Sequence, residues 1–203
     1  MSYFITFEGI EGCGKSTHSI LLAEYLHSIN YDVLLTREPG GPPISEKIRA
    51  ILLDRNHSEM LPQTELLLYM ASRSQHTGEW IKPALKEGKI VICDRYYDSS
   101  LAYQGGGRDL DLKVIRSITK FATFGLVPDC TILIDIPVEI GIERIKQKTP
   151  DRIESESIHF HEKVRNLFLD VAKEESKRYI IINGNKNIED IQAQIRELVL
   201  RRI

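Results

Sequence analysis

The feature that most constrains this chain is the glycine-rich segment at residues 9–16, Gly-Ile-Glu-Gly-Cys-Gly-Lys-Ser. It matches the pattern GxxxxGK[ST] in full, an apolar β-forming run precedes it, and a helical pattern follows it. The glycines allow a tight turn in which successive backbone N–H groups point at phosphate oxygens, and the helix adds the positive end of its dipole. The segment therefore predicts a nucleoside-triphosphate site directly after the first strand of an α/β fold.

This phosphate-binding loop (P-loop) assigns roles to individual side chains. Lys15 is expected to contact the β- and γ-phosphates of ATP, and the Ser16 hydroxyl is expected to ligate Mg²⁺. A chance match is disfavoured because strand, motif and helix occur in the required order. The residues predicted to bind ATP are Gly9, Ile10, Glu11, Gly12, Cys13, Gly14, Lys15, Ser16 and Thr17.

Five short runs rich in β-formers predict the strands of the sheet. They are nearly continuously apolar, as expected of parallel strands covered on both faces, and helical patterns separate them. Leu22, Leu26 and Ile29 recur at helical spacing after the first run, and residues 188–199 repeat the pattern more cleanly. We expect one domain over residues 1–203, with a five-stranded parallel sheet flanked by helices. Residues 40–43 and 105–107 are predicted loops within it, and the predicted strands are 3–7, 32–36, 90–93, 131–136 and 179–182.

Composition excludes several classes of protein. A net charge of −2 over 203 residues lacks the basic excess typical of nucleic-acid binding, so no nucleic-acid partner is expected. No apolar run approaches the roughly 18 residues needed to cross a bilayer, so no membrane association is expected. The three cysteines form no CxxC pair, which favours thiols in a reducing cytoplasm.

A GTPase-like regulator, which binds nucleotide without being a metabolic enzyme, is the main rival class. Such a protein needs Asn-Lys-x-Asp to read guanine, but the candidate stretch at 185–188 ends in Ile188. It also needs Asp-x-x-Gly after the third strand, where this chain has Asp94 followed by Arg95 and two tyrosines. Both departures disfavour the regulator, and residues 185–188 are predicted to form a polar turn before the last helix.

Arginines and lysines from several segments indicate a second anion site beside the P-loop. Two phosphates held in line repel each other, so a phosphoryl-transfer site must supply cations. Arg37 and Arg95 follow predicted strands, where side chains face the binding crevice of an α/β sheet. Arg73 lies on a central helical pattern, and the later cluster contains Arg144, Lys146, Lys148 and Arg152.

These residues sit in sequence strings that resemble the thymidylate kinase family along nearly the whole chain. The most specific strings are Arg-Glu-Pro-Gly-Gly at 37–41 and Ala-Tyr-Gln-Gly-Gly-Gly at 102–107, beside the P-loop. The resemblance implies the fold of P-loop nucleoside-monophosphate kinases, phosphorylation of dTMP to dTDP with ATP and Mg²⁺, and a homodimer. The alternatives are a kinase for another deoxynucleoside monophosphate and, far less favoured, a non-enzymatic regulator.

The resemblance also implies roles on the acceptor side. Tyr69 matches the aromatic that stacks on thymine, and Arg73 matches the residue that donates to a thymine carbonyl. Ser100 and Gln104 match positions along the base edge, and Tyr103 matches the ring beneath the deoxyribose. The predicted substrate-binding residues are Arg37, Glu38, Pro39, Tyr69, Arg73, Arg95, Ser99, Ser100, Tyr103 and Gln104.

For catalysis, the resemblance implies that Arg95 clamps the acceptor phosphate, that Glu11 positions the acceptor, and that Asp94 joins Ser16 near the metal. The P-loop has no arginine between positions 10 and 13, which resembles family members whose catalytic arginine lies in a lid, here at about 141–154. Lys146 and Lys148 stand where arginines are common in that lid, so the sequence leaves undecided which lid residue is the catalytic cation. The predicted catalytic residues are Lys15, Arg95, Glu11, Arg144 and Arg152.

Overall fold

The structure, a computed structural model, describes residues 2–147 and 149–203. Five strands form one all-parallel sheet in the order β2-β3-β1-β4-β5. The predicted five-stranded parallel sheet is therefore confirmed, and each predicted strand matches an observed one with its ends within one residue. The strands are β1 (Tyr3–Glu8), β2 (Val33–Arg37), β3 (Ile90–Asp94), β4 (Cys130–Asp135) and β5 (Tyr179–Asn183).

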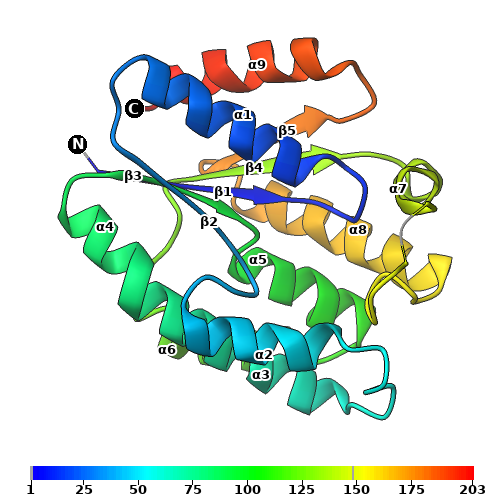
Figure 1. Cartoon of the computed structure of the whole chain (residues 1–203). Coiled ribbons are helices and arrows are strands. Elements are labelled where there is room, and N and C mark those ends of the chain that lie inside the picture. Colours follow the sequence, from blue (N-terminus) through cyan, green and yellow to red (C-terminus); the bar gives the residue numbers. More distant parts are fainter. Residues whose placement is uncertain (1, 148) are drawn as a thin grey trace.

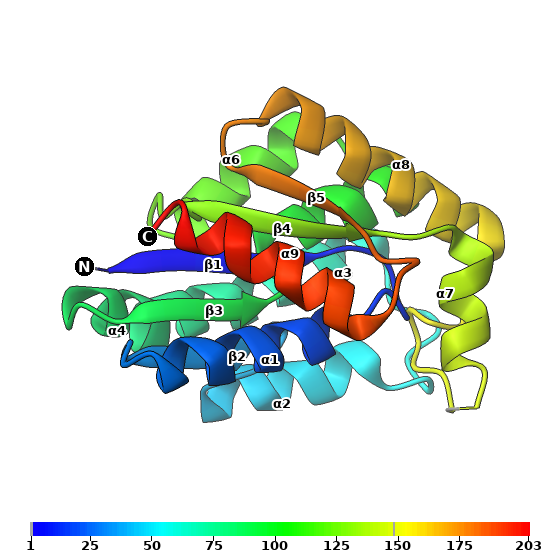
Figure 2. The same cartoon turned by 90° about the horizontal axis from the view of Figure 1, so that it is seen from above.

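Helices cover both faces of this sheet, as parallel crossover connections require. The first and last helices, α1 (Lys15–Ser28) and α9 (Ile188–Leu200), lie together on one face, whereas α8 (Ile158–Glu174) packs on the other (Figures 1 and 2). The remaining helical segments are α2 (Pro43–Leu53), α3 (Pro62–His76), η1 (Thr77–Ile81), α4 (Lys82–Lys86), α5 (Tyr97–Ser100), η2 (Leu101–Gly107), α6 (Leu112–Ala122) and α7 (Val138–Ile145). The last of these, α7, projects beyond the end of the sheet (Figure 1).

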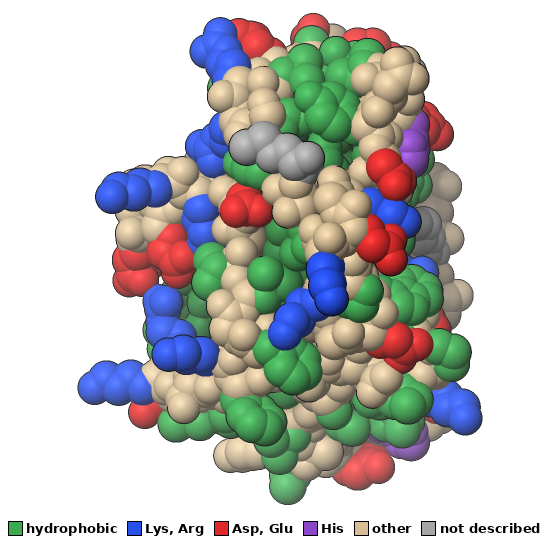
Figure 3. Space-filling model, turned by 90° about the vertical axis from the view of Figure 1, so that its left-hand side faces the viewer, with side chains coloured by type: hydrophobic (Ala, Val, Ile, Leu, Met, Phe, Trp, Pro, Cys, Tyr) green, Lys and Arg blue, Asp and Glu red, His purple; other side chains and the backbone are tan. Residues whose placement is uncertain are grey.

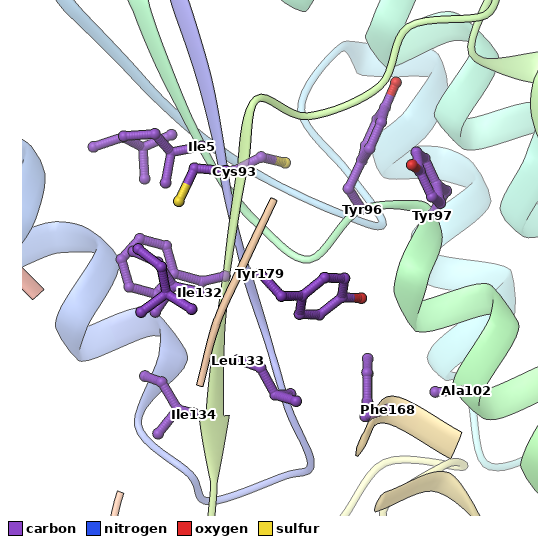
Figure 4. Packing of buried hydrophobic residues seen from close by; sticks show 14 of the residues in the cluster. Ile5, Cys93, Tyr96, Tyr97, Ala102, Ile132, Leu133, Ile134, Phe168 and Tyr179 are labelled. Atoms are coloured by element: carbon purple, nitrogen blue, oxygen red, sulfur yellow. The ribbon is translucent and has the colours of Figure 1, made fainter. Parts of the chain in front are cut away.

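The core lies on both sides of the central strands. On β4, Ile132 and Ile134 point toward α1, whereas Leu133 points to the opposite face, near Tyr179 and Phe168 (Figure 4). All three β4 side chains are buried. This two-sided burial is the physical reason for the uninterrupted apolar runs in the sequence.

Glycines at 105–107 do not form the loop that the sequence predicts. They lie in the π-helical segment η2, where they let α6 and α8 approach closely. A Cβ built on Gly105 would stand 2.4 Å from Leu112, and one on Gly107 would stand 2.3 Å from the Phe160 ring. These glycines therefore serve packing rather than chain reversal, and π-helical segments of this kind are frequent at functional sites.

Two smaller predictions about helix ends have opposite outcomes. Ile29 lies just beyond α1 and is 39% exposed, so the prediction that it belongs to the apolar pattern of this helix was wrong. The chain turns at Asn30, which has a φ of 67°. The polar turn before the last helix is confirmed over 185–187, where the Asn187 side chain caps α9 by accepting from the backbone N–H of Asp190; Ile188 already begins the helix. Among the described residues, no helix is long and apolar enough to cross a membrane.

Candidate active site

The sheet register brings the carboxyl ends of three strands together. Phe7 of β1 pairs with Asp94 of β3, which in turn pairs with Arg37 of β2. The loops after these strands line a cavity of about 480 Å³ at the edge that faces α7 (Figure 1). In the strand order, β2 and β3 lie on one side of β1, and β4 and β5 lie on the other. The direction of winding thus reverses at β1, and open α/β sheets bind ligands in the crevice at such a point.

Most of the predicted site residues share this cavity. Three of the exceptions, Gly9, Ile10 and Cys13, belong to the P-loop turn itself, and Arg152 is the fourth. The predicted residues that line the cavity are Glu11, Gly12, Gly14, Lys15, Ser16, Thr17, Arg37, Glu38, Pro39, Tyr69, Arg73, Asp94, Arg95, Ser99, Ser100, Tyr103, Gln104 and Arg144.

The P-loop conformation depends on glycine. Gly12 has a φ of 72°, and a Cβ at this position would stand 2.3 Å from the carbonyl oxygen of Gly141, so no side chain fits. Lys15 is nearly buried, and its Nζ donates to the carbonyl oxygen of Ile10 at 2.8 Å. The Ser16 hydroxyl, at the start of α1, hydrogen-bonds to the carboxylate of Asp94.

Arg95 lines the cavity between the P-loop and η2. Its backbone has a φ of 71°, a left-handed conformation that is uncommon outside glycine and clusters at functional sites. Its guanidinium donates to the carbonyl oxygen of Gly9 at 2.9 Å, to Ser99 Oγ at 3.1 Å, to Glu11 Oε1 at 2.9 Å and to Tyr103 Oη at 3.0 Å. Arg95 is thus held between the P-loop and η2.

Arg95, Tyr103 and His161 surround the Glu11 carboxyl group and keep it ionised. Burial alone would raise the pKa of this carboxyl, but the charge of Arg95, the nearby His161 ring and the hydrogen bond from Tyr103 hold that pKa well below its usual range. Tyr103 Oη donates to Glu11 Oε1 at 2.6 Å, and His161 Nδ1 lies 3.4 Å from Oε2. The site therefore contains a fixed carboxylate beside a fixed guanidinium.

Glu8, at the end of β1, supports the turn that carries Arg95. It is fully buried, and its carboxylate accepts from the backbone N–H of Tyr96 at 2.8 Å and from Ser99 Oγ at 2.6 Å. Burial and the neighbouring Asp98 carboxyl raise its pKa to about 7. Its contacts orient the chain after β3.

The far end of the cavity is built around a buried arginine. Arg73 is 1% exposed, and its Nε donates to Glu38 Oε2 at 2.7 Å. Its Nη1 donates to Ser100 Oγ at 2.8 Å, and its Nη2 donates to the carbonyl oxygen of Tyr96 at 3.1 Å. These contacts fix the guanidinium in one orientation beside the half-buried Tyr69.

The lid candidates lie in different places. Arg144 donates from Nη1 to the carbonyl oxygen of Gly12 and from Nη2 to that of Gly184, each at 3.2 Å. Arg152 is buried and donates from Nη1 to Glu65 Oε2 at 2.6 Å, away from the P-loop. The structure therefore brings Arg144, and not Arg152, to the P-loop.

The two lysines of the lid give less information. Lys146 is exposed and lies 3.4 Å from Glu143, one turn away. Lys148 lies outside the described residues.

Sequence reasoning missed several residues of the site. Arg49 of α2 lines the cavity and donates from Nη1 to the carbonyl oxygen of Pro39 at 2.6 Å, and Glu65 lies behind the far wall. Nothing in the local pattern around Arg49 distinguishes it from a surface arginine, because only the packing of α2 on α3 turns it inward. The other unpredicted lining residues are Leu53, Ile145, Asp151, Ile153 and Glu154.

Comparison with known proteins agrees with this geometry. The family model for thymidylate kinase matches residues 7–195. The chain belongs to the thymidylate kinase family. The thymidylate kinase of Geotalea daltonii is 48% identical over 211 residues, covering 100% of this chain and 99% of the relative. That of Geobacter sulfurreducens is 47% identical, again over 100% and 99%.

A solved structure shows the same fold. The crystal structure of thymidylate kinase from Ehrlichia chaffeensis superposes with a TM-score of 0.82 at 36% identity, and 98% of each chain is covered. The predicted family and the P-loop nucleoside-monophosphate kinase fold are both confirmed, and thymidylate kinases are phosphotransferases.

Proposed function

We propose that this chain transfers the γ-phosphoryl group of ATP to dTMP, with Mg²⁺, and releases dTDP and ADP. The observation that carries the proposal is one cavity that runs from Lys15 in the P-loop, past Arg95, to Arg73 and Gln104. A nucleotide kinase needs this continuity because the acceptor phosphate must meet the γ-phosphate in line. The names of the relatives favour dTMP as the acceptor.

The ATP side of the cavity fits a triphosphate with its metal. Residues 9–17 supply backbone N–H groups and the Lys15 ammonium for the phosphates. Ser16 and Asp94 offer two oxygen ligands close together, which suit Mg²⁺. The described residues hold no group of three or more His, Cys, Asp or Glu that could bind a metal, which fits an ion held mainly by substrate phosphates and water. Mg²⁺ bound there neutralises charge on the β- and γ-phosphates.

Arg95 is proposed to hold the acceptor phosphate, with Arg37 assisting from the end of β2. Glu11 and Tyr103 keep the Arg95 guanidinium in place, and the Arg95 guanidinium carbon lies 5.0 Å from the centre of the Tyr103 ring. The same Tyr103 ring packs beneath the deoxyribose. Catalysis then consists of positioning both phosphates and neutralising the negative charge that spreads in the transition state.

The base is proposed to lie at the far end of the cavity. Tyr69 stacks on thymine, Arg73 donates to a carbonyl of the ring, and Ser100 and Gln104 face its edge. The contacts of Arg73 with Glu38 and Ser100 support these roles, because they hold the guanidinium in one orientation at the cavity wall before a base arrives. Glu38, Pro39 and Ser99 complete the wall.

The experiment that tests the function measures ADP release from ATP and Mg²⁺ with single acceptors. We expect strong turnover with dTMP, weaker turnover with dUMP, and near none with dCMP, dGMP or UMP. Turnover confined to another acceptor would leave the P-loop chemistry in place but overturn the roles of Tyr69, Arg73, Ser100 and Gln104. No turnover with any acceptor would overturn the kinase proposal.

The segment at about 141–154 is proposed to act as a lid that closes over both substrates and excludes water. Arg144 is the lid cation that we assign to bound ATP. Arg144→Ala is expected to lower kcat/KM for ATP by about 10²-fold, the size typical of one lost charge contact in a transition state. Arg152→Ala is expected instead to cost stability, about 3 kcal/mol, because it breaks a buried ion pair.

Steady-state kinetics and thermal unfolding of these variants separate the two roles. Lys146→Ala, in the same segment but exposed, serves as the control and is expected to change kcat/KM for ATP less than threefold. A larger loss with Lys146→Ala or Arg152→Ala than with Arg144→Ala would contradict the assignment.

We also propose a homodimer that buries the face formed by α3 and α6, two helices that pack against each other. Leu67, Val114, Phe121 and Phe124 are 57%, 50%, 83% and 56% exposed on or just beyond these helices. Figure 3 shows a neighbouring side of the molecule, where hydrophobic side chains also reach the surface between charged ones. Sedimentation equilibrium is expected to give a mass of twice the 23.3 kDa of one chain. The Phe121→Asp variant is expected to sediment with the mass of a single chain. A wild-type mass of one chain would contradict the dimer.

A single domain in the cytoplasm completes the proposal. The buried apolar residues of all five strands belong to one cluster, and the three cysteines are all free and buried. Free buried thiols suit a reducing compartment. Recovery of the protein from the cell envelope after fractionation would contradict the location.

A further inference from the structure

Glu65, on the first turn of α3, carries a carboxylate that is wholly buried and has no part in the chemistry described above. Three side chains from elsewhere in the chain donate to it. Gln104 Nε2 donates to Oε1 at 2.8 Å, Arg108 donates from Nε at 3.3 Å and from Nη2 at 3.1 Å, and Arg152 Nη1 donates to Oε2 at 2.6 Å. Glu65 thus ties the far wall of the cavity to the segment that ends the lid.

Its partners keep this carboxylate ionised. Burial alone would raise the pKa of Glu65, but the hydrogen bonds from Arg108, Gln104 and Arg152 and the charge of Arg108 hold that pKa below its usual range. An ionised carboxylate can only accept hydrogen bonds. Gln104 must therefore turn its NH₂ group toward Glu65.

The orientation of the Gln104 amide decides what it offers the cavity. Gln104 lines the cavity, and its Oε1 accepts no hydrogen bond from the residues that the structure describes, nor is that atom enclosed. With the NH₂ group committed to Glu65, the group free for a ligand is a hydrogen-bond acceptor. The residue beside it on the preceding turn, Ser100, is already engaged by Arg73 at 2.8 Å.

A fixed acceptor distinguishes the pyrimidine bases. N3 of thymine or uracil carries a hydrogen that can be donated to Oε1, whereas N3 of cytosine is itself an acceptor and would leave both atoms unpaired. A site built around such a hydrogen bond rejects the analogue that lacks it, because buried polar groups are left without partners.

We propose that Glu65 is a positioning residue that sets base specificity: it locks the Gln104 amide with its carbonyl toward N3–H of the acceptor base. This inference rests on the proposed function, since it assumes that the base lies beside Gln104. Arg73 contacts a ring carbonyl independently of Gln104. Loss of the Glu65–Gln104 hydrogen bond is therefore expected to reduce discrimination against cytosine without abolishing it.

Glu65→Gln tests the proposal because a neutral amide can donate as well as accept, which allows the Gln104 amide to turn over. The ratio of kcat/KM for dTMP to that for dCMP is expected to fall about tenfold or more, the equivalent of one hydrogen bond. The ratio for dTMP to dUMP is expected to stay unchanged, because both bases carry N3–H. If Glu65 had a purely structural role, the variant would lower kcat/KM for all three substrates by the same factor. Both ratios would then stay unchanged, which would overturn the proposal.

Glu156→Gln is the matched control. Glu156 also pairs with Arg108, at 2.6 Å, whereas the Gln104 side chain is hydrogen-bonded to Glu65 and not to Glu156. We expect this variant to keep the dTMP to dCMP ratio of the wild type. An equal fall in the ratio would assign the effect to Arg108 and overturn the role of Glu65.

A second variant keeps the proposal testable if Glu65→Gln, which removes an ionic partner from two arginines, fails to fold. Gln104→Met retains those pairs and removes the amide, so the dTMP to dCMP ratio is expected to fall as well, and an unchanged ratio overturns the proposal. Where both variants fold, the double variant is expected to show no further fall. Wild-type protein without dTMP activity would instead overturn the proposed function, so the two failures are distinguishable.

Discussion

Lys15→Met is expected to lower kcat by about 10³-fold or more while leaving the protein folded, because it removes the P-loop ammonium that we propose contacts the transferred phosphoryl group. Methionine keeps the length and the apolar stem of lysine. The structural loss is two hydrogen bonds from Nζ, one to the carbonyl oxygen of Ile10, worth about 1 kcal/mol, and a weaker one to Cys13 Sγ at 3.5 Å.

ADP release with saturating dTMP measures the catalytic loss, and thermal unfolding checks the fold. Lys86→Met, an exposed lysine at the end of α4, is the matched control and is expected to retain wild-type turnover. Near-wild-type turnover by Lys15→Met would contradict the role of this residue. A large drop in melting temperature would show that the loss of activity comes from the fold.

Arg95→Ala is expected to lower kcat/KM for dTMP by about 10³-fold and to change KM for ATP much less. The guanidinium lies between the P-loop and η2, and its four hydrogen-bonding partners orient it before any acceptor arrives. Such preorganised charge contributes most where negative charge develops. Removing it also leaves the Glu11 carboxylate without its main cation, which further repels the acceptor phosphate.

Steady-state kinetics at varied dTMP and varied ATP separate the two effects. Arg95→Lys keeps the charge but loses the planar fork, so it is expected to recover only part of the activity. Equal losses for both substrates, or full activity in Arg95→Lys, would argue against a specific hold on the acceptor phosphate.

Local patterns in the sequence were enough to predict the five-stranded sheet and the position of the P-loop. Continuous apolar runs mark strands that are buried on both faces, and the P-loop with its flanking patterns places the triphosphate site at the end of β1. The rule that residues after parallel strands face the crevice brings Arg37, Asp94 and Arg95 to one edge, where the structure places them.

Short-range patterns failed where long-range packing decides the conformation. The three glycines at 105–107 resemble a loop by composition, yet they lie in the π-helical segment η2, where their lack of side chains allows α8 to pack closely. Arg144 and Arg152 are equivalent as cations eight positions apart in the sequence, and only the folded chain separates them, one at the P-loop and the other at Glu65.

The chain by itself therefore determined the sheet, the P-loop and the family, because these follow from periodicity and from motifs of adjacent residues. The tertiary structure alone decided which charged groups meet. Glu65 and Gln104 lie 39 positions apart, and Glu65 and Arg152 lie 87 apart. No local pattern carries such pairings, since burial and hydrogen bonding between distant segments arise only when the helices pack.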